Sequence, residues 1–102
     1  NLGLNPYELL LSSIGSCTSM TMRMYANRKK LKLDNIEVRL YYEREHCDDC
    51  NQQGYIEKII KRIKLDGDIN NEQKNRLMEI AERCPVNKTL MNDIEIKSEL
   101  IN

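Results

Sequence analysis

The sequence has no tryptophan, no phenylalanine and a single histidine, and its charges balance. Its 16 Lys and Arg residues match 16 Asp and Glu residues, so the formal net charge at pH 7 is zero. A balanced chain exerts no strong long-range attraction on nucleic acid or on an anionic membrane surface. Five tyrosines are the only aromatic side chains on which bases could stack. We therefore expect no nucleic-acid partner and no membrane partner.

Long apolar runs are also missing, as is a recognisable secretory leader. The most apolar segment, residues 5–30, carries many hydroxyl groups, and its unbroken apolar run is far shorter than the roughly 20 residues that span a bilayer. No charged segment followed by an apolar core and a cleavage site precedes it. A length of 102 residues fits one domain. We expect a single domain in a cytoplasmic protein.

Residues 5–30 predict one long helix. Asn5 is a suitable N-cap, Pro6 loses no hydrogen bond at the first helical position, and Glu8 lies in the first turn, where the helix dipole favours an acid. No charged side chain occurs between Glu8 and Arg23. A surface helix would show a charged stripe. We therefore expect this helix to be buried nearly all round, with Cys17 inside.

The remaining residues predict two strands, a second helix and a last strand, an α+β layout. Apolar residues alternate with polar ones over 36–43 and, with a helical period as the alternative, over 55–66. Asn70 with Gln73 predicts a capping box, and the apolar face of the helix that follows runs to Cys84. We expect turns at 32–35 and at Asp66-Gly67, a polar loop at 46–54, a short helical turn at 86–91 and a strand over 94–100.

Four cysteines are present, at positions 17, 47, 50 and 84. In a small secreted domain an even number would indicate a disulfide framework. Here Cys17 and Cys84 lie in core-facing helical contexts of a highly charged chain, which favours reduced, working thiols. Packing as small apolar side chains is the alternative for both, because free cysteine is among the most buried residue types.

Two motifs resemble those of the OsmC/Ohr family. NPYELLL at residues 5–11 with GSCT at 15–18 is similar to the family's cysteine helix, and CPVNKTL at 84–90 is similar to its second cysteine motif. The resemblance covers residues 5–96. It implies an OsmC-like fold, with a long central Cys-bearing helix and a second helix packed against an antiparallel sheet in an intertwined homodimer. It also implies that residues 1–102 form one OsmC-like domain without the family's N-terminal strands.

The resemblance implies a thiol-dependent peroxidase of oxidative-stress defence that reduces organic hydroperoxides. Cys17 would attack the peroxide and Cys84 would resolve the sulfenic acid as a disulfide, which an external dithiol, typically a lipoyl group, would reduce. Residues Asn5, Pro6, Tyr7 and Glu8 would line or support the site. The peroxidases of the family carry Glu after the Asn-Pro pair, where this chain has Tyr7. They also use an Arg from the N-terminal strand region, which this sequence does not contain.

A third group, His46, Cys47 and Cys50, supports several interpretations. Two thiols and an imidazole make half of a zinc site, but no other His is available to complete it. The alternatives are a redox-active Cys-x-x-Cys and incidental thiols in a loop. We expect no bound cofactor. The basic groups 28–30 and 58–64 are interpreted as solvated surfaces. The rival to a peroxidase is a non-catalytic protein of the same fold that binds a small molecule or a metal and has a redox-sensing cysteine pair.

Overall fold

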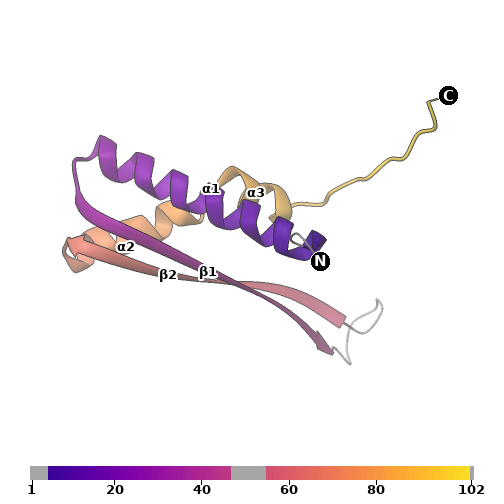
Figure 1. Cartoon of the computed structure of the whole chain (residues 1–102), viewed down its shortest axis with the longest axis horizontal. Coiled ribbons are helices and arrows are strands. Elements are labelled where there is room, and N and C mark those ends of the chain that lie inside the picture. The colour runs from indigo at the N-terminus through magenta and orange to yellow at the C-terminus, as the bar shows by residue number, and fades with distance from the viewer. Residues whose placement is uncertain (1–4, 47–54, 102) are drawn as a thin grey trace.

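The computed structural model describes residues 5–46 and 55–101, which form three helices and a two-stranded antiparallel ribbon. The elements in chain order are α1 (Pro6–Arg28), β1 (Lys32–His46), β2 (Tyr55–Asp68), α2 (Asn71–Ala81) and α3 (Pro85–Met91). Helix α1 is the centre of this arrangement, because it packs against β1, α2 and α3 (Figure 1). The predicted α+β class, with a long Cys-bearing helix against an antiparallel pair of strands, is confirmed.

Both ends of α1 follow from its sequence. The Asn5 side-chain oxygen accepts a hydrogen bond from the Glu8 backbone N–H at 2.8 Å, and the Asn5 amide donates to the Glu8 carboxylate at 2.8 Å. At the other end Lys30 adopts φ 56, and the Leu31 N–H donates to the Ala26 carbonyl at 2.9 Å. The chain therefore reverses at Lys30. The turn predicted at 32–35 is wrong, because β1 has already begun there.

The β1–β2 ribbon confirms that residues 55–66 form a strand. Its register pairs Ile36 with Leu65 and Leu40 with Lys61. The turn predicted at Asp66-Gly67 is wrong, because β2 continues to Asp68 and Gly67 pairs with Leu33. The pairing shifts between Leu33 and Asn35, and Gly67 has φ +149 there; a Cβ on Gly67 would overlap the Lys32 carbonyl oxygen. The glycine therefore serves an irregularity within the ribbon rather than a turn after it.

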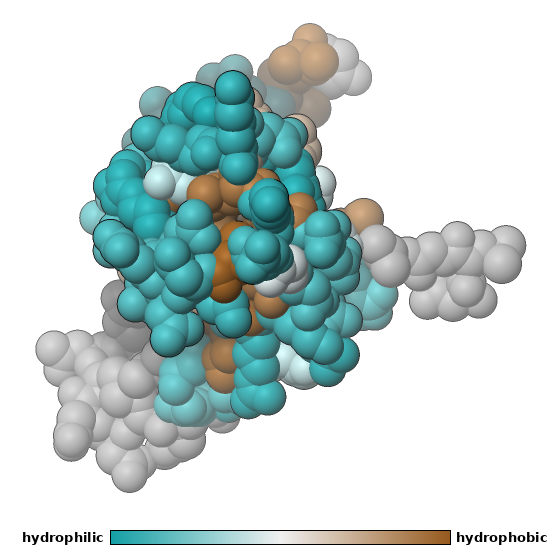
Figure 2. Space-filling model, turned by 90° about the vertical axis from the view of Figure 1, so that its left-hand side faces the viewer, coloured by the Kyte–Doolittle hydropathy of each residue, from teal (hydrophilic) through white to brown (hydrophobic). Residues whose placement is uncertain are grey.

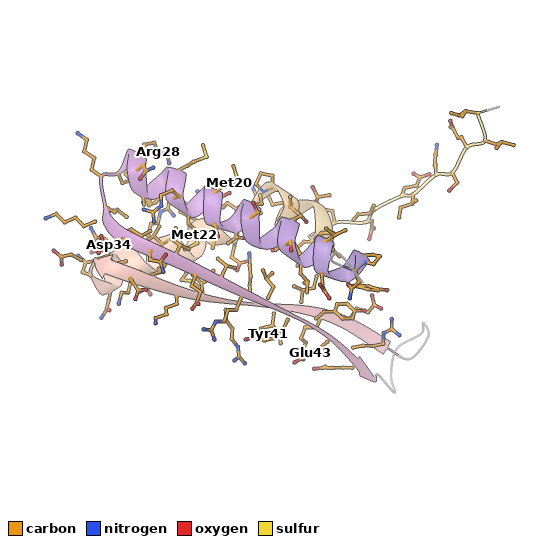
Figure 3. The ribbon with its side chains drawn as sticks, in the orientation of Figure 1. Met20, Met22, Arg28, Asp34, Tyr41 and Glu43 are labelled. Atoms are coloured by element: carbon orange, nitrogen blue, oxygen red, sulfur yellow. The ribbon has the colours of Figure 1, made fainter. Side chains whose placement is uncertain are left out.

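The core lies between the C-terminal half of α1, the start of the ribbon and α2. Its fully or nearly fully buried members are Met22, Ala26, Leu33, Leu77 and Ala81. Figure 3 shows Met22 pointing from α1 toward the strands and Met20 pointing away from them. Met20 is 62% exposed and Met24 is 69% exposed. The expectation that α1 is buried nearly all round is therefore wrong for this chain, in which only one stripe of α1 is covered.

The second half of the chain matches its prediction in part. The capping box forms, with the Gln73 N–H donating to Asn70 Oδ1 at 2.8 Å and the Asn70 N–H donating to Gln73 Oε1 at 3.0 Å. Helix α2 ends at Ala81, so Cys84 follows the helix instead of belonging to its last turn. Helix α3 confirms the predicted short helical segment.

The strand predicted over 94–100 is wrong for this chain. Residues 93–101 leave the body in an extended course, without a strand assignment (Figure 1). Ile96 is 87% exposed and Leu100 is 90% exposed. A strand exists through hydrogen bonds to a neighbouring strand, and β1–β2 is the only strand pairing among the described residues. The alternating pattern is present, but this segment has no strand partner in the described chain.

The surface is mainly hydrophilic at the end of the molecule where α1 meets β1. Figure 2 shows hydrophilic residues surrounding a smaller hydrophobic area at that end. No helix of the described segments combines the length and hydropathy needed to cross a bilayer.

Candidate thiol site

The structure brings Cys17 and Cys84 together, as their proposed roles require. Cys17 lies in the middle of α1 and is partly exposed, whereas Cys84 precedes Pro85 at the start of α3 and is fully buried. Both cysteines are free thiols. Helix α1 packs against α3, and Cys17 lies close enough to Cys84 to lower the pKa of the Cys84 thiol. Two cysteines 67 positions apart in the sequence are therefore neighbours in the fold.

The surroundings of Cys84 stabilise its thiolate form. Burial raises the pKa of the Cys84 thiol, but hydrogen bonds from Cys17, the Asn87 backbone, the Thr18 hydroxyl and the Val86 backbone lower it, and the net pKa is below the ordinary value of 9.0. The Val86 and Asn87 backbone groups belong to the first turn of α3, and Cys84 is the N-cap of that helix without forming a regular side-chain cap hydrogen bond. The buried sulfur is thus provided with donors, which favour the anion.

Lys61 is a residue of this site that the sequence analysis placed elsewhere. Its ammonium group is hydrogen-bonded to Thr18 Oγ1 at 3.2 Å, to the Ala81 carbonyl at 3.3 Å and to Asn87 Oδ1 at 3.4 Å. The side chain is partly buried, so its assignment to a solvated surface was wrong. A signal was available in the sequence. Lys61 shares the inward strand face with Ile63 and Leu65, because side chains two residues apart point to the same side of a strand.

The predicted support residues Asn5, Pro6, Tyr7 and Glu8 occupy the start of α1. Cys17 follows Asn5 by 12 positions, or about 18 Å along a helix that rises 1.5 Å per residue. Asn5 and Glu8 cap the helix by bonding to each other. The Tyr7 ring lies 5.2 Å from the ring of Tyr42 on β1. The structure thus places Tyr7 against the ribbon, and the four residues lie at the start of α1, apart from Cys17. Their support of the site stays a prediction.

A groove lies between the N-terminal half of α1 and β1. It has a volume of ≈ 500 Å³. Its lining residues are Glu8, Leu11, Ser12, Gly15, Ser16, Ser19, Val38 and Leu40. Successive residues of a helix are about 100° apart, so Cys17 points to the flank of α1 opposite Ser19. The groove and the thiol pair are therefore on different sides of the helix.

The predicted zinc half-site falls largely outside the described residues. Cys47 and Cys50 are not among them, and His46 is described only as the last backbone position of β1. Within the part of the chain that the structure describes, no group of three or more His, Cys, Asp and Glu side chains is arranged to hold a metal ion. The zinc and redox interpretations of this motif stay predictions.

The cysteine helix, the ribbon beneath it and the second cysteine before α3 define a class of protein. The OsmC-like protein family model matches residues 1–99, and the chain belongs to that family. Solved structures agree on the fold. The organic hydroperoxide resistance protein OsmC from Legionella pneumophila is 19% identical with a TM-score of 0.69, over 88% of this chain and 64% of its own.

Two further structures are similar over the same core. The OsmC-like protein from Mycoplasma pneumoniae is 17% identical with a TM-score of 0.74, covering 89% of this chain and 64% of its own. An OsmC-like hydroperoxide resistance protein from Jannaschia sp. CCS1 is 20% identical with a TM-score of 0.72, over 98% and 68%. The chain thus spans 64% of the length of the Legionella and Mycoplasma structures. No curated protein matches at a significant level.

Proposed function

We propose that this protein is a thiol-dependent peroxidase that reduces organic hydroperoxides, with Cys17 as the attacking thiol and Cys84 as the resolving thiol. The observation that carries the proposal is the packing of α1 against α3, which brings Cys17 near enough to Cys84 to lower the pKa of that thiol. Family membership supports it, as do the names of two similar structures as hydroperoxide resistance proteins.

The reactants that the proposed cycle consumes are the hydroperoxide and an external dithiol. The Cys17 thiolate attacks the terminal peroxide oxygen, the O–O bond breaks, and the leaving alkoxide takes a proton to become an alcohol. Cys17 is then a sulfenic acid. The Cys84 sulfur attacks the Cys17 sulfur, a disulfide forms and water leaves. A dithiol, which we propose to be of the lipoyl type, reduces the disulfide and restores both thiols.

The exposure of the two cysteines supports this division of roles. Cys17 is partly exposed, so a peroxide can reach its sulfur, whereas Cys84 is fully buried and has no such access. A buried thiol beside an accessible one is suited to resolution, because the sulfenic acid forms within its reach. The disulfide also protects Cys17 from further oxidation.

The lowered pKa of Cys84 suits its proposed role as the resolving thiol. A thiolate is the form that attacks another sulfur, and the hydrogen bonds to the Cys84 sulfur favour that form. The Cys84 thiolate would therefore be available to attack the Cys17 sulfenic acid.

Apolar surface near Cys17 favours an organic peroxide as substrate. Leu10 and Met24 precede and follow Cys17 by seven residues, or nearly two helical turns, and so share its flank of α1. Leu10 is 37% exposed and Met24 is 69% exposed. An alkyl or aryl group bound there would bury apolar area that hydrogen peroxide does not have.

We also propose a homodimer in the cytoplasm. Exposed apolar side chains on α1 and in the C-terminal segment support the dimer, among them Leu9, Ile96 and Leu100. A second copy would cover surface that this chain leaves open, and an extended segment such as 93–101 becomes a strand when another strand pairs with it.

Peroxide consumption driven by a dithiol tests the proposed activity. Reduced protein would be mixed with cumene hydroperoxide and dihydrolipoamide, and loss of peroxide would be followed. We expect turnover in the wild type and in the Cys47→Ser, Cys50→Ser double variant, and no turnover in Cys17→Ser. Turnover that survives Cys17→Ser, or is missing from the wild type, would contradict the proposal.

One observation favours the rival, a non-catalytic protein of this fold. Tyr7 stands where the peroxidases of the family carry Glu, and its ring packs at 5.2 Å from that of Tyr42 instead of reaching the thiols. Such a protein would bind a small molecule or a metal and use the cysteine pair as a redox sensor. It would form the Cys17–Cys84 disulfide slowly and show no turnover with excess dithiol.

A further inference from the structure

Lys61 brings a positive charge to the thiol site, and none of the described residues supplies an acidic partner for it. The inward faces of β1 and β2 are lined mainly by apolar side chains, and Lys61 lies among them opposite Leu40. Its three hydrogen-bond acceptors are a hydroxyl, a carbonyl and an amide oxygen, all of them neutral. Within residues 5–46 and 55–101, no carboxylate forms an ion pair with Lys61. A partly buried ammonium with neutral partners favours an anion nearby.

Thr18 connects this ammonium group to the thiols. Thr18 is fully buried, and its hydroxyl oxygen accepts a hydrogen bond from Lys61 at 3.2 Å. A helical threonine commonly donates its proton to the carbonyl four residues earlier, as Thr21 does to the Cys17 carbonyl at 2.8 Å. Thr18 makes no such bond to the described backbone, and its hydroxyl is one of the groups that lower the pKa of the Cys84 thiol.

We propose that Lys61 is a positioning residue of the thiol pair, which orients the Thr18 hydroxyl toward the Cys84 sulfur and supplies the positive charge that favours the thiolate. Lys61 occupies the Thr18 oxygen as a donor, so the Thr18 proton is left for the sulfur. Lys61 also bonds to the Asn87 side chain, and the Asn87 backbone faces the same sulfur. This inference deepens the proposed function, on which its relevance to peroxide reduction rests.

A purely structural role for Lys61 predicts a different result. Its bonds to the Thr18 side chain and the Ala81 carbonyl join β2 to α1 and to the end of α2. If that connection were its whole purpose, removal of the ammonium group would lower stability and leave the titration of the thiols unchanged. The pH at which the thiolate forms therefore separates the two roles.

The test is a thiolate titration by ultraviolet absorbance, which needs neither peroxide nor access to the buried sulfur. The starting protein is the Cys47→Ser, Cys50→Ser double variant of the full chain, so that only the pair titrates. We expect Lys61→Met to raise the midpoint of the first thiolate by about one pH unit or more. Lys64→Met, on the opposite face of the same strand and exposed, is the matched control and should not move the midpoint.

Two further variants keep the test decisive if Lys61→Met folds poorly. Thr18→Val removes the hydroxyl with little change in shape and should also raise the midpoint. Thr18→Ser retains the hydroxyl and should leave the midpoint at the value of the starting protein. Unchanged midpoints in a folded Lys61→Met or Thr18→Val protein would overturn the proposal. A raised midpoint in a protein whose wild type does not consume cumene hydroperoxide would support this inference while the proposed function fails.

Discussion

The two halves of α1 differ in how far other elements cover them, and Cys17 lies at the boundary between the halves. The C-terminal half buries Met22 and Ala26 completely against residues such as Leu33 and Leu77. The N-terminal half has Ile14 as its buried apolar side chain and borders the groove of ≈ 500 Å³. The comparison shows that the packing of this chain covers the C-terminal half of α1 and leaves most of its N-terminal half exposed. Cys17 thus belongs to a rigid element beside open surface.

Substitution of the two methionines should show the largest difference between covered and open surface. Met22→Ala should lower the free energy of unfolding by about 2–5 kcal/mol, because it leaves a cavity in the core. Met20→Ala should change it by less than about 0.5 kcal/mol, since that side chain is 62% exposed. Urea unfolding of both variants gives the comparison. Equal losses would contradict the difference between the two surfaces.

Two glycines sharpen the comparison at the level of the backbone. Gly67→Ala should destabilise the protein by about 1–3 kcal/mol, because φ +149 is strained for alanine and the Lys32 carbonyl blocks the new methyl group. At Gly15 a methyl group would meet only the flexible Leu40 Cδ1, at 2.7 Å. Alanine there also gains up to about 1 kcal/mol of helix propensity, so the net change should be small. Thermal unfolding measures both, and a larger loss at Gly15 would contradict the account.

The two helix caps should show a smaller difference. Asn70→Ala removes the capping box of α2, which packs into the core, and should cost about 1 kcal/mol. Asn5→Ala removes the equivalent cap of α1 at the open end, where local fraying can absorb the loss, so its effect on global unfolding should be smaller. Hydrogen exchange of the first turn of each helix would check this. Equal global costs would mean that the start of α1 is held as firmly as α2.

The pH dependence of stability should show the smallest effect. The pKa of Cys84 is lowered in the folded protein, so its contribution is fully present above the unfolded value near 9.0 and is lost as the pH falls through the lowered value. In reducing buffer, the stability of the wild type relative to Cys84→Ser should therefore rise with pH up to about 9. A difference that is flat or falls over this range would contradict the lowered pKa.

The sequence predicted a helix or strand correctly where its signal lies in residues close together in the chain. The Asn5 cap and the Asn70 capping box have their donors and acceptors within three positions, and the alternation of residues 36–43 records which face of β1 is covered. The wrong turn at Asp66-Gly67 has a physical reason. An Asp-Gly pair is typical of a turn, but a glycine also serves an irregularity within a strand. Only the pairing of Gly67 with Leu33 distinguishes the two.

The sequence predicted the two cysteines of the site, but it did not predict that the charged side chain of Lys61 belongs to the site. Cys17 and Cys84 stand in recognisable motifs, but nothing local to Lys61 states that its ammonium group reaches Thr18, 43 positions away. Its place among inward-facing apolar residues was readable from the period of the strand. The predictions were wrong for the exposed stripe of α1 and for residues 93–101. An apolar pattern predicts that a surface is covered, but it does not identify the element that covers it.

The most direct test of the account is the fate of the two thiols after one equivalent of peroxide. Reduced protein would be pulsed with cumene hydroperoxide, quenched, and mapped by mass spectrometry with and without Cys84→Ser. The account predicts a fast Cys17–Cys84 disulfide in the wild type and a Cys17 sulfenic acid in the variant. Thiols that remain unchanged while the peroxide persists, or oxidation that begins at Cys84, would contradict it.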